Sequence, residues 1–272
     1  MKKLRIGIVG CGAIGSSLAR EISRSLGRVA VLSGLFDIRP ERSQLLSKRI
    51  VKNQRLYVSD LEALIKKSDL IIEASSARAS WGIASSVLAS GVKIMVMSVG
   101  GIVGHLEELF NLASRKNTQV YFPSGAICGI DGLKAAKIAG IQKIILTTRK
   151  NPKAFNGVEY VTKRFNLSGL KKDKILFDGT AGQAVKYFPQ NINVAAVLGL
   201  AGIGMSKTKV RIIASPTVSK NIHEVLIESS AARIFTRTEN VLHPQNPKTS
   251  YLAVLSAMAT LKQILEPVKI GT

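Results

Sequence analysis

The chain has 272 residues, 46% of them hydrophobic, and its 39 lysines and arginines against 17 aspartates and glutamates give a formal net charge of +22. This composition predicts a folded protein of two modest domains, and because no apolar run approaches the roughly 18 residues of a bilayer span or the length of a signal peptide, we expect a cytoplasmic protein without a membrane segment. The basic residues are spread along the chain without a basic tail, which favours a solvated surface that attracts small anions over specific nucleic-acid binding.

The first 122 residues alternate short apolar segments with amphipathic ones. The spacing predicts strands at residues 4–9, 29–36, 56–58, 69–74, 92–97 and 118–122. It predicts helices between them at residues 13–25, 39–46, 61–67, 79–90 and 105–116. Strands that are apolar on both faces and alternate with helices form a parallel sheet covered on both sides. The sequence therefore predicts an α/β protein with a doubly wound Rossmann domain at residues 1–122.

The pattern changes near residue 123, where runs of strands replace the alternation. After a helix at residues 127–138, strand-like runs are expected at residues 143–148, 158–164, 174–177, 209–214, 223–228 and 232–239, with an apolar helix at about 193–203. Such runs predict a largely antiparallel sheet and an α+β second domain at residues 123–245. Residues 247–264 again show helical spacing, opened by Asn246 as cap and Pro247, and we expect residues 246–272 to return to the first domain.

A glycine-rich turn, Gly10-Cys11-Gly12-Ala13-Ile14-Gly15, joins the first predicted strand to the first predicted helix. Gly10 allows a tight turn, Gly12 lets the backbone approach a pyrophosphate, and Gly15 lets the helix pack closely on the strand. The first amides of the helix, around Ala13 and Ile14, offer donors and positive potential to phosphates. A glycine turn that binds nothing is the alternative, and the strand–turn–helix context favours dinucleotide binding.

Asp37 follows the second predicted strand, about 20 residues beyond the last glycine, where a carboxylate meets the adenosine ribose of NAD. Arg39, two residues later, is either a plain surface arginine or a partner for the 2′-phosphate of NADP. We therefore expect NAD as cofactor, with NADP possible. Ligands lie beyond the carboxyl ends of such strands, which places Ala74 and Ser75, and the loop at residues 98–101, beside the nicotinamide half.

Three further segments carry a resemblance to a known family. They are Phe122-Pro-Ser-Gly-Ala-Ile127, Phe188-Pro-Gln-Asn-Ile-Asn-Val-Ala-Ala196 and His243-Pro-Gln-Asn-Pro-Lys-Thr-Ser250. With the glycine turn, their order and spacing make the chain resemble the L-aspartate dehydrogenase family over nearly its whole length. The resemblance implies a Rossmann domain with a substrate and dimerisation domain, and oxidation of L-aspartate to iminoaspartate with NAD or NADP. The imine then hydrolyses to oxaloacetate and ammonia, or feeds quinolinate and NAD biosynthesis.

The resemblance also implies roles for three residues. Matched by motif, the active-site histidine is His223, and the cofactor-contacting positions are Ala126 and Asn193. Strand alternation places His223 on the face of Val225 and Ile227, half-buried, where periodicity alone favours a core histidine. A histidine with a pKa near neutrality can take the amine proton or activate the water that hydrolyses the imine. The Asn193 amide could bind the nicotinamide carboxamide or ribose, and a plain helix cap that needs no ligand is the alternative. Ala126 would act through its backbone amide, in a turn whose following helix is capped by Ser124.

The remaining expectations concern ligands and rivals. A dicarboxylate such as L-aspartate needs cationic donors, and the sequence singles out none of its many arginines and lysines. Neither cysteine has a metal-ligand spacing, so no metal is expected. We expect a homodimer formed through the sheet of the second domain. The alternatives are a related two-domain reductase acting on homoserine, dihydrodipicolinate or a sugar, and a non-enzymatic regulator that senses NAD.

Overall fold

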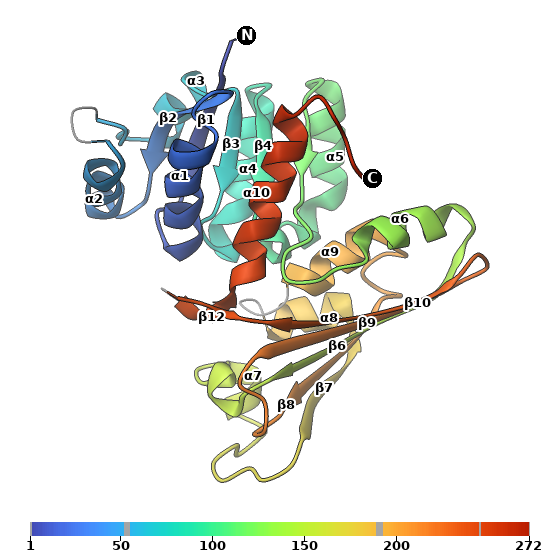
Figure 1. The fold of residues 1–272 in the computed structure, drawn as a ribbon. Helices are drawn as coiled ribbons and strands as arrows, with labels where there is room; N and C mark the ends of the chain where they lie inside the picture. Colours follow the sequence, from blue (N-terminus) through green and yellow to red (C-terminus); the bar gives the residue numbers. More distant parts are fainter. Residues whose placement is uncertain (1, 52–54, 189–192, 245, 272) are drawn as a thin grey trace. The chain divides into compact units, whose positions relative to one another are not determined.

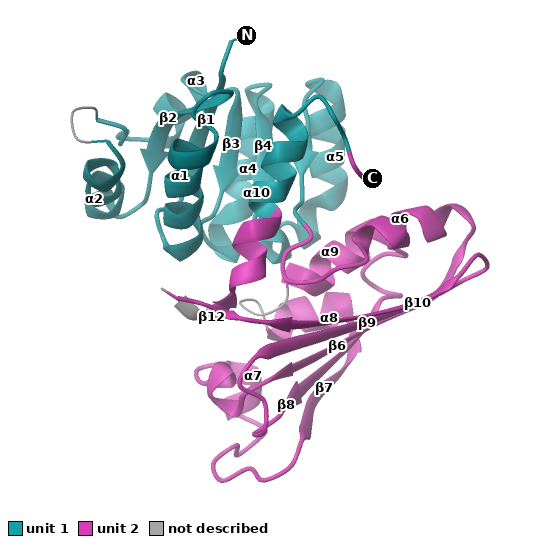
Figure 2. Ribbon diagram, in the orientation of Figure 1, with its two compact units in different colours: residues 1–123, 257–269 teal, residues 124–256, 270–272 magenta. Residues whose placement is uncertain are grey.

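The computed structural model describes residues 2–51, 55–188, 193–244 and 246–271 (Figure 1). The chain divides into two compact units, which Figure 2 colours separately. Unit 1 comprises Met1–Pro123 and Ala257–Lys269, and unit 2 comprises Ser124–Ser256 and Ile270–Thr272. Among the described residues, none of the helices combines the length and the apolar character that a bilayer crossing requires.

Unit 1 contains a five-stranded parallel sheet of order β2-β1-β3-β4-β5. Its strands are β1 (Leu4–Val9), β2 (Ala30–Phe36), β3 (Leu70–Glu73), β4 (Lys93–Val96) and β5 (Val120–Tyr121). Its helices are α1 (Ala13–Ser25), α2 (Pro40–Ile50), α3 (Leu61–Lys66), α4 (Ala77–Ala89) and α5 (Leu106–Arg115). The predicted Rossmann architecture is confirmed. The chain leaves β1 toward β2 on one side and returns to β3 on the other, so the strand order reverses at β1, where such sheets bind ligands.

One element of unit 1 is weaker than predicted. The strand expected at residues 56–58 is a single bridge between Tyr57 and Leu35 at the edge of the sheet. Three residues provide too few backbone pairs for a strand of their own, although Leu56 is buried and its carbonyl accepts from the Leu35 amide at 2.7 Å. The residues therefore close the edge beyond β2 without extending the sheet.

Unit 2 contains a five-stranded sheet of order β10-β9-β6-β8-β7. Its strands are β6 (Ile141–Lys150), β7 (Lys174–Thr180), β8 (Lys209–Ala214), β9 (Asn221–Ser229) and β10 (Arg233–Asn240). Helices α6 (Ile130–Ile138), α8 (Ala181–Tyr187) and α9 (Asn193–Ala201) lie on one face of this sheet (Figure 1). Apolar side chains of the same face, such as Ile144, Leu146, Val225 and Ile227, form the core beneath these helices.

The sheet of unit 2 is largely antiparallel, as predicted, and contains one parallel pair, β6 with β8. One prediction for unit 2 needs correction. The run at residues 158–164, expected as a strand, holds the short helix α7 (Glu159–Thr162). The Val158 carbonyl accepts from the amides of Val161 and Thr162, so local turns satisfy a backbone that finds no strand partner. Val161 is buried in the core, and its burial outweighs the β-propensity of a valine.

The C-terminal helix begins later than predicted. Leu242–His243 (β11) and Asn246–Ser250 (β12) form a small antiparallel pair, and helix α10 spans Tyr251–Leu265. Asn246 and Pro247 were expected to open the helix, and they lie instead in β12. Proline fixes φ at a value that both a first helical turn and an extended chain accept, and it pushes the preceding residue toward extended backbone. The division between the units falls within α10, between Ser256 and Ala257.

Candidate functional site

The glycine turn of unit 1 has the backbone that the motif predicts. Gly10 has φ +93°, and a β-carbon there would come within 2.5 Å of the Ala74 carbonyl oxygen. A β-carbon on Gly15 would come within 1.9 Å of the Gly10 carbonyl oxygen, so only glycine fits at these two positions. A β-carbon on Gly12 would meet no atom within 4 Å. Gly12 is the N-cap of α1 and makes no side-chain cap, so the backbone amides of the first helical turn remain available to a phosphate.

Asp37 holds this turn from the end of β2. Its carboxylate is 7% exposed, and Oδ2 accepts the Cys11 amide at 2.7 Å while Oδ1 accepts the Arg39 amide at 2.9 Å. The structure thus brings the predicted residues Asp37 and Arg39 together at the turn. Burial, and then the charge on Asp37, raise the pKa of the Cys11 thiol to about 12, which keeps this thiol protonated at neutral pH and unsuited to nucleophilic chemistry.

A buried carboxylate fixes the next two loops of unit 1. Glu73 ends β3 and is 0% exposed. One of its oxygens accepts the amide and the hydroxyl of Ser75, at 2.8 and 2.7 Å, and the other accepts the amide of Ser98 at 3.0 Å. Glu73 therefore binds both the loop after β3, which carries the predicted positions Ala74 and Ser75, and the loop after β4, which carries Ser98.

The inner face of the unit 2 sheet changes character along its strands. Ile144 pairs with Ile227, and Leu146 pairs with Val225, in two apolar rows. In the next row, Thr148 on β6 pairs with His223 on β9, which pairs with Thr238 on β10. Beyond that row, Asn221 pairs with Asn240, and Lys150 pairs with Ala214. We call the five buried polar side chains of these last two rows the polar end of the unit 2 sheet: Thr148, Lys150, Asn221, His223 and Asn240.

His223 is the centre of this polar end. It lies on the predicted face and is 3% exposed, so it is buried more completely than expected. Its Nδ1 lies 3.0 Å from the Thr148 hydroxyl, and within the described parts of the chain Nε2 has no hydrogen-bond partner. When Nδ1 carries the proton and donates it to Thr148, Nε2 keeps a free lone pair and can accept a proton.

The charge state of His223 differs from the expected one. Burial, and then the positive charge on Lys150, lower the pKa of His223 to about 3, well below the near-neutral value we expected. The imidazole is therefore neutral at physiological pH. Burial also lowers the pKa of Lys150, to about 8, so the lysine keeps its proton at neutral pH. The polar end thus pairs a neutral base with a buried cation.

The predicted position Ala126 joins the polar end through its carbonyl. The Ala126 carbonyl accepts the Thr238 hydroxyl at 3.1 Å and the Asn240 amide at 3.0 Å. Thr238 also donates to the His223 carbonyl at 3.4 Å, so the turn at Ala126 is tied to β9 and β10 beside the imidazole. Ser124 was expected to cap the following helix. Helix α6 begins instead at Ile130, and its N-cap is Gly129, which has φ +89°.

Asn193 is the first residue of α9 and is partly buried. A β-carbon on Gly125 would lie 3.8 Å from the Val194 side chain, so the start of α9 adjoins the turn that holds Ala126. The structure therefore gathers three predicted positions, Ala126, Asn193 and His223, within unit 2. The predicted residues of the glycine turn, Asp37, Arg39, Ala74 and Ser75 gather within unit 1. Residues 189–192 of the motif that ends at Ala196 lie outside the described residues.

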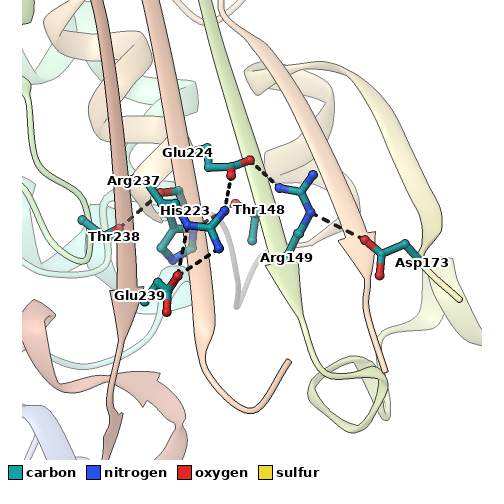
Figure 3. A network of polar contacts seen from close by, with 8 residues as sticks. All are labelled: Thr148, Arg149, Asp173, His223, Glu224, Arg237, Thr238 and Glu239. Carbon is teal, nitrogen blue, oxygen red and sulfur yellow. Dashed lines mark hydrogen bonds and ion pairs between the residues drawn. The ribbon is translucent and has the colours of Figure 1, made fainter. Parts of the chain in front are cut away.

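The outer face of the same strands carries an ion-pair network. Glu224, next to His223 on β9, accepts from Arg149 on β6 and Arg237 on β10 (Figure 3). Arg149 also pairs with Asp173 at 3.6 Å, and Arg237 with Glu239 at 2.9 Å. Because side chains alternate across a sheet, these charges lie on the opposite face from His223 and compensate one another. None of them contributes to the lowered pKa of His223, for which Lys150 is the one charge responsible among the described residues.

Four residues of the polar end were not predicted as site residues: Thr148, Lys150, Asn221 and Asn240. The sequence signal for two of them was the alternation Ile144-x-Leu146-x-Thr148-x-Lys150, which places Thr148 and Lys150 on the same inner face of β6 as the apolar residues. We ended the predicted strand at residue 148, which left Lys150 in a loop.

The chain is similar in sequence and in fold to known proteins. The family described as "Aspartate dehydrogenase, C-terminal" matches residues 131–264, and that described as "Homoserine dehydrogenase, NAD binding domain" matches residues 10–123. L-aspartate dehydrogenase from Methanosarcina mazei is 46% identical over 99% of this chain and 100% of its own length. The enzyme of that name from Nitrosopumilus maritimus is 37% identical over 98% of this chain and 99% of its own.

A solved structure gives the same result at the level of the fold. The crystal structure of aspartate dehydrogenase from Thermotoga maritima matches 99% of this chain and 100% of its own, with a TM-score of 0.74 and 25% identity. The expected resemblance is thereby confirmed at full length, and the chain belongs to the L-aspartate dehydrogenase family.

Proposed function

We propose that the chain catalyses the NAD(P)-dependent oxidation of L-aspartate at its Cα–N bond. The observation that carries the proposal is the buried, neutral His223 at the polar end of unit 2, in a chain related over its full length to L-aspartate dehydrogenases. The product is iminoaspartate, which hydrolyses to oxaloacetate and ammonia or enters quinolinate and NAD biosynthesis.

The residues of unit 1 fit a dinucleotide. The amides at Gly12, Ala13 and Ile14 open the first turn of α1, and the open space beside Gly12 gives a pyrophosphate access to them. Asp37 would take the adenosine ribose, which favours NAD, and Arg39 would take the 2′-phosphate of NADP. Gly10 and Gly15 shape the turn and the packing of α1, and Ala74 and Ser75 would lie beside the nicotinamide half. In unit 2, Ala126 and Asn193 are the cofactor-contacting positions that the family resemblance implies. Bound NAD(P) supplies the acceptor for the hydride that leaves Cα.

The protein's own contribution is to move a proton. The amine of L-aspartate is an ammonium at neutral pH, and its nitrogen needs a lone pair before the imine can form. Nε2 of His223 accepts that proton, while the hydroxyl of Thr148 fixes the tautomer through Nδ1. After His223 has released that proton to solvent, the same nitrogen can take a proton from the water that attacks the imine.

A substrate panel tests the proposal. The purified protein is given NAD or NADP with L-aspartate, D-aspartate, L-glutamate or L-homoserine, and the absorbance of reduced nicotinamide is followed. We expect turnover with L-aspartate well above the other three. Turnover that favours L-homoserine would support the rival reductase, and no turnover with any amino acid would support the NAD-sensing regulator.

The His223→Ala variant separates binding from chemistry. It removes the proton acceptor in unit 2 and leaves the glycine turn of unit 1 unchanged, so we expect normal NAD affinity and loss of most turnover. The matched control is His105→Ala, which removes a histidine of unit 1 that stacks on Trp81. Near-normal aspartate oxidation by His223→Ala would show that His223 has another role.

Two properties remain predictions, a cytoplasmic location and a homodimer formed through the sheet of unit 2. The outer face of β10 supports the second, because Phe235 is 63% exposed there beside the ion pairs of Arg237. Sedimentation of the protein against its Phe235→Glu variant tests this: a dimer that becomes a monomer is the expected result, and a wild-type monomer rules the homodimer out.

A further inference from the structure

The turn before α6 and the end of β10 place an unpaired donor close to an unpaired acceptor. The carbonyl of Ala126 is fully engaged, because the Thr238 hydroxyl donates to it at 3.1 Å and the Asn240 side-chain amide donates to it at 3.0 Å. The backbone N–H of Ala126 has no hydrogen-bond partner within the described part of the chain, although the residue is only 6% exposed. Buried backbone donors are almost always paired, so this N–H is available to a bound molecule.

The unpaired acceptor is Oδ1 of Asn240, a residue that is 3% exposed. The amide nitrogen of its side chain donates to the carbonyls of Ala126 and Asn221, at 3.0 and 3.3 Å, so a flipped amide would set oxygen against oxygen. Oδ1 is therefore correctly identified, and it is buried without a hydrogen-bond partner among the residues that the structure describes. A buried acceptor without a partner is destabilising, and an N–H donor of a bound molecule would satisfy it.

A primary carboxamide is complementary to this donor and acceptor. Its carbonyl oxygen accepts and its NH2 group donates, side by side in one plane. A carboxylate offers no N–H to Oδ1, and an ammonium offers no acceptor to the Ala126 amide, so neither of these groups satisfies both atoms. Nicotinamide carries a primary carboxamide on the ring carbon next to the one that receives the hydride.

The position of Asn240 in the sheet suits a contact with nicotinamide. On the inner face His223 of β9 pairs with Thr238 of β10, and the next pair along these strands is Asn221 with Asn240. Asn240 is therefore a diagonal neighbour of His223, and diagonal neighbours in an antiparallel pair lie roughly 7–8 Å apart. A ring held by its carboxamide at Asn240 would thus lie close to the imidazole that takes the proton.

We propose that Asn240 is a cofactor-binding residue, whose Oδ1 accepts the carboxamide N–H of nicotinamide while the backbone amide of Ala126 donates to the carboxamide oxygen. The inference rests on the proposed function, which takes Ala126 as a cofactor-contacting position, and it adds Asn240 and the chemical group that both residues recognise. Because Oδ1 is covered by the chain, binding requires a local displacement of the side chains around it.

Binding of a cofactor analogue tests the proposal without turnover. The acetylpyridine analogue of NAD has a methyl group in place of the carboxamide NH2, so it lacks the donor and keeps the oxygen. Isothermal titration with NAD and with this analogue is run on the wild type, on Asn240→Leu and on Thr238→Val. The wild type should bind NAD about tenfold more tightly than the analogue, and Asn240→Leu should bind both equally. Thr238→Val is the matched control, because it removes the other donor to the Ala126 carbonyl and leaves Oδ1 in place, so it should keep the wild-type ratio.

Equal affinity of the wild type for NAD and the analogue would overturn the proposal. If Asn240→Leu does not fold, the titrations of the wild type and Thr238→Val decide, and a tenfold preference for NAD in both supports the proposal. A preference that persists in Asn240→Leu would also overturn it, and a raised KM for L-aspartate in that variant would then assign Oδ1 to the substrate amine. If Asn240→Leu loses the preference but the wild type oxidises no amino acid, the proposed function fails while the carboxamide subsite stands.

Discussion

The burial of His223 predicts a loss of stability in mild acid. The folded protein holds the imidazole neutral down to about pH 3, whereas an unfolded chain protonates a histidine near pH 6.5. Between these values the unfolded state binds a proton that the folded state does not. The contribution of neutral His223 to the free energy of unfolding is therefore fully present above about pH 6.5, and it decreases as the pH falls toward 3.

The magnitude follows from the linkage relation. One proton of difference changes the free energy of unfolding by about 1.4 kcal/mol per pH unit. Between pH 7 and pH 5, His223 should therefore cost about 2 kcal/mol of stability. The His223→Gln variant cannot titrate at this position, and its stability should fall by about 2 kcal/mol less over the same interval. Comparing the two pH differences cancels the contributions of the carboxylates, which both proteins share.

The free energy of unfolding is measured in urea at pH 7 and at pH 5. Tryptophan fluorescence would report on unit 1, because the single tryptophan, Trp81, lies there. Unfolding of unit 2 is therefore followed by hydrogen exchange of the β9 peptide. His105→Gln is the matched control, since it keeps His223 and should retain the acid sensitivity assigned to it. If His223→Gln loses as much stability as the wild type between pH 7 and pH 5, the imidazole is not buried in its neutral form and our reading of the site is wrong.

Three further predictions concern unit 1. Gly12→Ala should fold normally, because a β-carbon there meets no atom within 4 Å, yet bind NAD at least about tenfold more weakly by titration; Gly82→Ala in α4, equally free of contacts, is the control, and unchanged NAD affinity of Gly12→Ala would contradict the turn's role. Glu73→Gln turns an amide toward the donors of two loops, so thermal unfolding should show a loss of about 1–3 kcal/mol together with weaker NAD binding, and a wild-type melting curve would refute this. Arg39→Ala should raise the KM for NADP severalfold more than that for NAD in steady-state kinetics, and an equal effect on both would remove Arg39 from the 2′-phosphate site.

Local patterns were sufficient for most of the framework. The period of the apolar residues predicted the sheet of unit 1. The glycine motif predicted the turn between β1 and α1, where Gly10 has the positive φ that a glycine allows. The face of His223 followed from alternation with Val225 and Ile227. The activity followed from the resemblance to a family, since no spacing of residues identifies L-aspartate as the substrate.

The errors arose where partners distant in the sequence decide the outcome. Residues 158–164 alternate like a strand, but no edge of the unit 2 sheet accepts them, and they form α7. Pro247 suits a helix start and an extended chain equally, and pairing with β11 decides for the latter. The pKa of His223 depends on Lys150, which is 73 positions earlier in the sequence and reaches the imidazole only through the pairing of β6 with β9.

The central claim is that the hydride from Cα of L-aspartate is passed to a nicotinamide. The most direct measurement supplies the enzyme with NAD and L-aspartate deuterated at Cα, and weighs the reduced cofactor by mass spectrometry. We predict NADH that carries the deuterium from Cα. Unlabelled NADH, or none, would contradict the claim.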